Sequence, residues 1–241
     1  MSIQKLKELI TNSGNIVFFG GAGTATESNI PDFRSEAGLY QTNGGYSYPP
    51  EVMLSHTFFM NHTEEFYGFY RKKMIYPEAK PNLAHYALTE LEKRNKLKAI
   101  LTQNIDGLHQ AAGSRNVLEI HGSIHRNYCL ACGKAYTLDY IVNSPSTVPK
   151  CGKCGGIVRP DVVLYEEGLD MDIWQKARYF VSTADVFIVG GTSLVVYPAA
   201  SLVEYYKGGR LVLINKSTTP YDERATLAIH DSIGKVLNSI L

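Results

Sequence analysis

The sequence predicts an α/β protein with an open parallel sheet that is covered by helices on both faces. Short, mostly apolar runs are typical of strands buried on both sides of a sheet. Such runs recur at residues 16–19, 99–102, 117–120, 186–189 and 211–214, and helical patterns occur at residues 1–14, 82–94, 197–206 and 233–241. Because strands and helices alternate along the chain, we expect the strands to run parallel.

The expected helices are recognised by apolar residues that recur on one helical face. In residues 1–14, Leu6 and Ile10 share a face, and Gly14 marks the end of the stretch. In residues 82–94, Ala87 and Leu91 are in phase in the same way. A spacing of four residues places such pairs one above the other, so each helix can cover the sheet with an apolar stripe.

The size and charge of the chain argue against several classes of protein. Its 241 residues carry 24 basic and 23 acidic side chains, for a net charge of +1. This balance argues against nucleic-acid binding, and no apolar run approaches the ~20 residues that a membrane-spanning helix needs. Charged side chains also interrupt the first helical pattern, where a secretion signal would be apolar. We therefore expect a cytoplasmic protein without nucleic-acid or membrane partners, and we expect a monomer.

All four cysteines lie in one short region, as two Cys-x-x-Cys pairs with eighteen residues between them. Two such pairs fit a tetrahedral zinc site, and without an export signal disulfides are the weaker alternative. The sequence therefore predicts one zinc ion bound by Cys129, Cys132, Cys151 and Cys154. Because four thiolates leave no open coordination position, this zinc should be structural.

The first expected strand leads into a glycine-rich loop, Gly20-Gly21-Ala22-Gly23. Such a loop lets backbone amides approach a phosphate, although a Gly-x-Gly pattern alone is weak evidence. Thr26 stands where the usual dinucleotide fingerprint has its third glycine, and residues 40–48 lack the acidic residue that would hold a ribose. A hydride-transferring dehydrogenase therefore fits poorly.

Further polar clusters follow the other expected strands, at residues 102–109, 121–123, 190–193 and 215–217. Each alone could be a helix cap or a simple turn. Together, at the carboxyl edge of one sheet, they favour a nucleotide cleft. His121 is the best candidate for a general base because an imidazole titrates near neutral pH, with His109 and His125 as competitors.

These motifs together resemble those of the sirtuins, the NAD-dependent protein-lysine deacylases. The matching segments occur in the family's order and span almost the whole chain. They are Gly21-Ala-Gly-Thr-Ala-Thr-Glu-Ser-Asn-Ile-Pro-Asp-Phe-Arg34, Thr102-Gln-Asn-Ile-Asp-Gly-Leu-His109, His121-Gly122, the two Cys-x-x-Cys pairs, Gly191-Thr-Ser193 and Asn215.

The resemblance implies a Rossmann-like NAD-binding domain at residues 1–34, 77–126 and 158–241, with a parallel sheet and helices on both faces. It also implies a small domain made of a helical insertion at residues 35–76 and a zinc-ribbon module at residues 127–157. NAD and an acetylated-lysine protein or peptide would enter the cleft between them. The cofactor contacts that it implies are Ala22, Thr26, Phe33, Arg34, Gln103, Asn104, Ile105, Asp106, His121, Thr192, Ser193, Asn215 and Ile233, and the peptide contacts are Val163 and Tyr165.

The implied activity is NAD-dependent deacetylation of protein lysine. The acyl oxygen attacks the ribose C1′ carbon, nicotinamide leaves, and His121 then acts as general base on a ribose hydroxyl. The products would be deacetylated lysine, nicotinamide and O-acetyl-ADP-ribose. Two alternatives stay open: an NAD-dependent protein mono-ADP-ribosyltransferase, and a non-catalytic zinc-ribbon binding module.

The chain departs from the usual sirtuin pattern at several positions. Ala25 replaces a serine, Asn29 and Glu166 replace glycines, and Tyr165 replaces a phenylalanine. The loss of a hydroxyl at position 25 could weaken NAD positioning by about one hydrogen bond, and a side chain at position 166 could alter peptide affinity.

Desuccinylating sirtuins resemble one another in a Tyr-x-x-Arg pair that receives the acyl carboxylate. Here Tyr67 is followed at that spacing by Tyr70, and Arg71 is one place further along. On a helix this offset turns the side chain by ~100°. We therefore expect acetyl and other neutral acyl groups to be preferred over succinyl.

Overall fold

The computed structural model describes residues 2–33, 38–39 and 46–241. Its centre is a six-stranded parallel sheet in the order β3-β2-β1-β7-β8-β9. The strands are β1 (Ile16–Gly20), β2 (Leu97–Thr102), β3 (Val117–Glu119), β7 (Val186–Gly190), β8 (Leu211–Ile214) and β9 (Leu227–Ile229). The five expected strands are thus confirmed, while the three-residue strand β9 was not expected.

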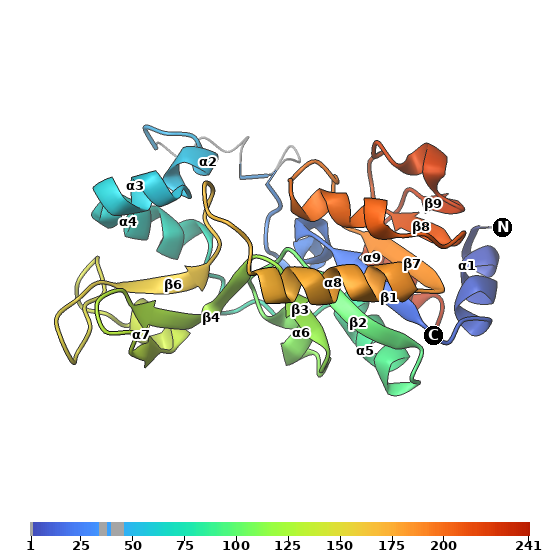
Figure 1. Ribbon diagram of the computed structural model, residues 1–241, viewed down its shortest axis with the longest axis horizontal. Coiled ribbons are helices and arrows are strands. Elements are labelled where there is room, and N and C mark those ends of the chain that lie inside the picture. Colours follow the sequence, from blue (N-terminus) through green and yellow to red (C-terminus); the bar gives the residue numbers. More distant parts are fainter. Residues whose placement is uncertain (1, 34–37, 40–45) are drawn as a thin grey trace.

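Helices cover both faces of this sheet, as expected (Figure 1). On one face lie α1 (Ser2–Thr11), α5 (Leu83–Lys93) and α9 (Ile233–Asn238), and on the other lie α8 (Met171–Thr183) and the 3₁₀ helix η3 (Ala199–Tyr205). Side chains alternate along each strand, so Phe18 packs toward α5 and Phe19 toward α8. The α-helix expected at residues 197–206 is instead the shorter 3₁₀ helix η3, which begins after Pro198.

The strand order reverses between β1 and β7, because the chain continues outward through β2 and β3 on one side and through β8 and β9 on the other. Ligands of open parallel sheets bind beyond the carboxyl ends of the strands at such a switch point. The loop after β1 carries two short 3₁₀ helices, η1 (Ala22–Thr24) and η2 (Thr26–Ser28), and α6 (Leu108–Ala111) follows β2. The fold thus brings the polar strand ends to one edge.

A second, smaller assembly lies beside the parallel sheet, on the left in Figure 1. It holds an antiparallel sheet of β5 (Ala135–Tyr136), β4 (Gly122–Cys129) and β6 (Val158–Val162), with α7 (Leu138–Val142). The helices α2 (Pro50–Met53), α3 (His56–Asn61) and α4 (Thr63–Lys73) share one hydrophobic cluster with it. Within the described residues, no helix is long and apolar enough to cross a membrane.

Candidate active site and metal centre

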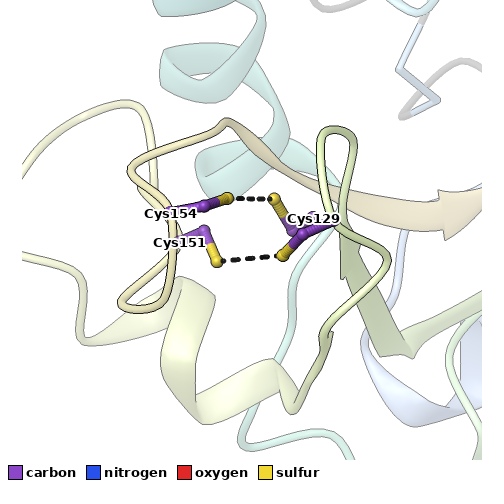
Figure 2. A group of neighbouring side chains, drawn as sticks. Cys129, Cys151 and Cys154 are labelled. Carbon is purple, nitrogen blue, oxygen red and sulfur yellow. Dashed lines mark hydrogen bonds between the residues drawn. The ribbon is translucent and has the colours of Figure 1, made fainter.

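The four cysteines form one cluster, in which Cys129, at the end of β4, lies opposite Cys151 and Cys154 (Figure 2). The sulfur atoms of Cys129 and Cys154 are 3.5 Å apart, those of Cys132 and Cys151 are 3.7 Å apart, and all four lie within 4.8 Å of one another. A tetrahedron with Zn–S bonds of about 2.3 Å has S···S edges of about 3.8 Å. None of the four forms a disulfide, and the cluster is compatible with one structural zinc ion.

Neighbouring groups donate hydrogen bonds to one of these sulfurs. The Tyr136 hydroxyl lies 3.0 Å from Cys151 Sγ, and the Lys153 amide donates to the same sulfur at 3.3 Å. The Tyr136 hydrogen bond, with the neighbouring amides, lowers the pKa of Cys151 to about 6. Donors of this kind stabilise the thiolate form, which is the form that binds zinc.

A cleft of about 1680 Å³ is lined both by the carboxyl edge of the parallel sheet and by the small assembly. Every predicted cofactor and peptide residue that the structure describes lines this cleft. They are Ala22, Thr26, Phe33, Gln103, Asn104, Ile105, Asp106, His121, Val163, Tyr165, Thr192, Ser193, Asn215 and Ile233. The predicted contact Arg34 lies outside the described residues.

The loops after β1 and β7 interlock at the edge of the cleft. The Gly23 amide donates to Gly191 O at 2.8 Å, and the Gly21 amide donates to Gly190 O. A Cβ atom at Gly21 would lie 2.8 Å from Thr192 Cβ, and one at Gly23 would lie 2.8 Å from Gly191 Cα. The glycines therefore serve the close approach of the two loops, and these two amides are not free for a phosphate as the sequence had suggested.

Amide side chains connect the strand ends and leave donors open. Thr192 donates its backbone N–H to Asn215 Oδ1 at 2.8 Å and accepts from Gln103 Nε2 at 3.0 Å. The Nδ2 atoms of Asn104 and Asn215 are buried and have no partner among the described residues. Because an unsatisfied buried donor is costly, these groups fit a ligand with many acceptor oxygens, as NAD has in its riboses, phosphates and carboxamide.

His121 has the geometry of a neutral base. Its Nδ1 lies 3.2 Å from the carbonyl oxygen of Gln103. Since a carbonyl can only accept, Nδ1 carries the proton and Nε2 keeps its lone pair. Burial lowers the pKa of His121 below its usual 6.5, so the ring is uncharged at neutral pH and can take up a proton.

Asp106 is held in an unfavourable environment for a charge. Burial raises its pKa from 3.8 to about 6, although Oδ1 accepts the Leu108 amide at 2.8 Å. The hydrogen bond confirms the local turn at Asp106, and no described residue forms a hydrogen bond to its second oxygen, so a ligand could use it. A perturbed carboxyl group in a cleft is typical of functional sites.

The two other candidates for the general base, His109 and His125, differ in their position relative to the cleft. His109 is only 1% exposed, packs against His85 with ring centroids 4.7 Å apart, and does not line the cleft. His125 lines the cleft, and its Nε2 lies 3.0 Å from the backbone oxygen of Asp106. Geometry therefore excludes His109 as a base that reaches a ligand in the cleft and leaves His125 next to the Asp106 loop.

The segment that carries both predicted peptide contacts, residues 163–165 and called the peptide strand below, is already bonded to the rest of the protein. The Val163 amide donates to His121 O, the Tyr165 amide donates to Leu54 O, and Tyr165 O accepts from the His56 amide, each at 3.0 Å. Among the described residues, the Val163 carbonyl has no partner. It is the group on this strand that an incoming peptide backbone could use.

The two positions that depart from glycine both have positive φ angles. Asn29 has φ 63° and Glu166 has φ 77°. Asparagine tolerates this left-handed conformation, whereas for glutamate it costs about 1–2 kcal/mol. The Glu166 carboxylate accepts the Thr57 amide at 2.8 Å, which ties the peptide strand to α3 and offsets the strain. Both positions thus keep the backbone shape for which glycine is usual.

Two polar residues next to the glycine-rich loop were not expected. Glu27 Oε1 accepts from Ser232 Oγ at 2.6 Å and from the Gly234 amide at 2.9 Å. Asn82 Nδ2 donates to the same loop from the other side. An asparagine directly before a helical pattern is a capping signal, but nothing in the sequence indicates its contact with a loop more than fifty residues away.

Comparison with known proteins agrees with this site. The model of the Sir2 family matches residues 21–198. A protein of Clostridium acetobutylicum named NAD-dependent protein deacetylase is 66% identical over 239 residues, which cover 99% of this chain and 98% of that protein.

Solved Sir2 structures are similar over the full length of the chain. A Sir2 variant with a deacetylated p53 peptide and 3′-O-acetyl-ADP-ribose has a TM-score of 0.92 at 39% identity. A Sir2 complex with a p53 peptide and NAD⁺ has a TM-score of 0.88 at 41% identity. Both comparisons cover 100% of this chain and 97% of the other. The chain belongs to the Sir2 family.

Proposed function

We propose that this protein removes acetyl groups from protein lysine side chains with NAD as co-substrate, and that His121 is the general base. The single observation that carries the proposal is the convergence of His121, Asp106 and the peptide strand on one cleft. In the same cleft, the Nδ2 atoms of Asn104 and Asn215 have no partner among the described residues and supply donors for the acceptor-rich co-substrate. The full-length relationship to named deacetylases supports the same activity.

The order of the strand-end residues supports an arrangement for the co-substrate. Ile105 and Asp106 would hold the nicotinamide carboxamide, and Gln103 the adjoining ribose. Thr192, Ser193, Asn215 and Ile233 would line the adenosine end, while Ala22, Thr26, Phe33 and Arg34 would cover the cofactor from the β1 loop. When bound, NAD supplies a cationic nicotinamide leaving group, so the protein mainly orients reactants and moves a proton.

The proton step belongs to His121. Its Nδ1–H is fixed on the Gln103 carbonyl, so Nε2 would accept the proton of a ribose hydroxyl. The Gln103 backbone also donates to Gly20 O at 3.0 Å, which anchors the base to the end of β1. The ring therefore needs no rearrangement when it takes up the proton.

The peptide would lie along residues 163–165 beside this base. Because the Val163 amide donates to His121 O, the strand and the base are held in fixed register. The Val163 carbonyl, which no described residue occupies, would accept from the peptide backbone. Tyr165, which is 38% exposed, would form a wall for the acyl-lysine. The division into residues 1–34, 77–126 and 158–241, a helical insertion 35–76 and a zinc module 127–157 would place the peptide between the two domains.

We also propose that the protein acts as a monomer in the cytoplasm and does not bind nucleic acid. The net charge of +1 supports the last point, and unpaired cysteines suit a reducing compartment. Light scattering after size exclusion, with and without NAD, would detect a dimer and so refute the monomer.

The proposed activity is tested by incubating the protein with NAD and an acetyl-lysine peptide and quantifying every product by mass spectrometry. We expect deacetylated peptide, nicotinamide and O-acetyl-ADP-ribose in equal amounts. ADP-ribose attached to the peptide or to the protein, without loss of acetyl, would instead identify a mono-ADP-ribosyltransferase. An absence of NAD binding would favour a non-catalytic zinc-ribbon module.

A further inference from the structure

Asn82, the residue before α5, has every polar group bonded. Its Oδ1 accepts a hydrogen bond from the Ala84 backbone N–H at 2.9 Å, which caps the helix. Its backbone N–H donates to His85 Nδ1 at 3.2 Å. Its carbonyl accepts the Tyr86 amide at 3.2 Å. Three hydrogen bonds thus fix the residue to the start of an eleven-residue helix.

The remaining group of Asn82, its Nδ2, bonds to a distant part of the chain. It donates to Thr24 O at 2.8 Å and to Ser28 Oγ at 2.9 Å. Thr24 is fully buried, and Ser28 is 5% exposed. Capping of the helix requires only the oxygen of the side chain, so the two bonds from Nδ2 are additional to that role.

These two bonds reach the back of the loop that borders the cleft. Thr24 and Ser28 do not line the cleft, whereas Ala22, Ala25 and Thr26 beside them do. Asn82 does not line the cleft either. Its side chain can therefore influence a ligand only through the position of the loop.

The partner that fixes the Asn82 backbone is a buried, uncharged histidine. His85 is fully buried, and burial lowers its pKa to about 4. With this pKa the ring is neutral at neutral pH. Because Nδ1 accepts the hydrogen bond of the Asn82 backbone, the proton is carried by Nε2. The hydrogen bond from the Asn82 backbone to His85 should therefore persist over the pH range in which the enzyme would work.

We propose that Asn82 is a positioning residue for NAD. Its side chain fixes the loop after β1 to the start of α5, so that Ala22, Ala25 and Thr26, which line the cleft, are already in the shape that binds NAD. The loop would otherwise have to be ordered when the ligand binds, and a preorganised loop avoids that cost. The inference uses the NAD site of the proposed function and adds a residue outside the cleft to it.

Two substitutions separate the two roles of the side chain. Asn82→Asp and Asn82→Ser each keep an oxygen that can cap the helix, but both lose the Nδ2 group that donates to Thr24 O and Ser28 Oγ. A charged aspartate has no donor, and the single hydroxyl hydrogen of serine cannot serve both acceptors. We expect the Kd for NAD, measured by calorimetry, to rise about five- to thirtyfold in both, as the loss of one or two hydrogen bonds predicts. The KM for acetyl peptide at saturating NAD should change less than twofold.

Asp170→Ala is the matched control. Asp170 caps α8 by accepting the amides of Asp172 and Ile173 at 2.9 and 3.0 Å, and it does not line the cleft. Its loss should lower the thermal midpoint as the loss of a cap does. We expect the Kd for NAD to stay within twofold of the wild type.

The outcomes are distinguishable. The inference is overturned if both Asn82 variants bind NAD within twofold of the wild type, or if Asp170→Ala weakens binding as much as they do. If the wild-type protein bound NAD but left acetyl peptide unchanged, the proposed catalysis would fail. The calorimetric comparison would still decide the role of Asn82.

Discussion

The charged carboxylate of Asp106 is needed for the proposed chemistry but lowers the stability of the folded protein. Because its pKa is raised to about 6, the folded state keeps a proton that the unfolded state loses from about pH 4 upward. Stability therefore falls between about pH 4 and pH 6 and stays lower above this range. The raised pKa corresponds to a cost of about 3 kcal/mol at neutral pH.

Replacement of this carboxylate should stabilise the protein. We expect Asp106→Asn to raise the free energy of unfolding by about 2–3 kcal/mol at pH 7 and to leave it nearly unchanged at pH 4, as urea denaturation can measure. We expect kcat/KM for NAD to fall at least ~100-fold, because an amide cannot act as a charged acceptor for the carboxamide. An equal change in stability at both pH values would contradict the assigned cause.

Where desuccinylating sirtuins have the arginine of their Tyr-x-x-Arg pair, the part of this chain that the structure describes places Tyr70 on the cleft. Tyr70 lines the cleft, is 1% exposed, and its hydroxyl has no partner among the described residues. Arg71 does not line the cleft and instead donates to Ser146 O at 3.1 Å. The Tyr67 hydroxyl is also occupied, since it donates to the carbonyl of Val158.

The acyl preference should follow from this arrangement. We expect kcat/KM for an acetyl peptide to exceed that for the matching succinyl peptide at least ~100-fold, because burial of an unpaired carboxylate is costly. In Tyr70→Arg the ratio should shift toward succinyl. Comparable rates for both peptides with the wild-type enzyme would refute the expectation.

At the scale of elements, the peptide strand is held by an ion-pair cluster. Arg159, which is 7% exposed, donates to both carboxylate oxygens of Glu167 at 2.7 and 3.0 Å. Glu167 also accepts the Leu164 amide at 2.9 Å and lies 2.8 Å from His56 Nδ1. Burial opposes the charge of Glu167, but these hydrogen bonds lower its pKa to about 2.

Removal of the charge on Glu167 should loosen this strand. Because its pKa is lowered, Glu167 contributes stability above about pH 4.5 that is lost as the pH falls toward 2. We expect Glu167→Gln to lower the free energy of unfolding by about 3 kcal/mol at pH 7, with a shrinking difference below pH 4.5, and to raise the KM for peptide. An unchanged unfolding free energy at pH 7 would show that the cluster is not stabilising.

Elements were predictable where burial alone determines the sequence. Strands such as β1 and β7 are buried on both faces, so their residues are almost all apolar. β9 escaped prediction because its apolar run ends after three residues, whereas the run that predicted β3 continues to Ile120. β4 escaped prediction because polar and apolar residues mix in it. η3 was wrong in type, since an apolar face does not distinguish an α-helix from a 3₁₀ helix.

The candidate site was predictable where motifs mark strand ends, and not where distant segments meet. The residues 103–106 and 191–193 could be placed because each segment begins directly after a strand. The bonds of Asn82 and Glu27 to their partners depend on tertiary packing, which no local pattern encodes. Two glycines of the β1 loop were assigned to phosphate approach, although packing against Gly191 requires them.

At the scale of the whole molecule, the two sheets depend on different cores. The parallel sheet has one hydrophobic cluster on each face, and the small assembly has a third that includes Cys129 and Cys151. A structural zinc ion should therefore stabilise the third cluster and leave the first two intact.

Cys132→Ser should destabilise the third cluster while the two clusters of the parallel sheet stay intact. We expect the variant to lose its one zinc ion per chain, measured by elemental analysis, because three thiolates bind zinc less tightly than four. Hydrogen exchange should increase in residues 122–162 and in α2, α3 and α4, while β1, β2 and β7 stay protected. Uniform loss of protection would indicate that the molecule unfolds as one unit.

The central claim is that His121 acts as the base after nicotinamide has left. The most direct test compares two rates in His121→Ala: exchange of labelled nicotinamide into NAD in the presence of acetyl peptide, and deacetylation of that peptide. We expect deacetylation to fall at least ~1000-fold while exchange stays within about tenfold of the wild type, and His125→Ala to retain both. Parallel loss of exchange and deacetylation in His121→Ala, or deacetylation that persists, would contradict the account.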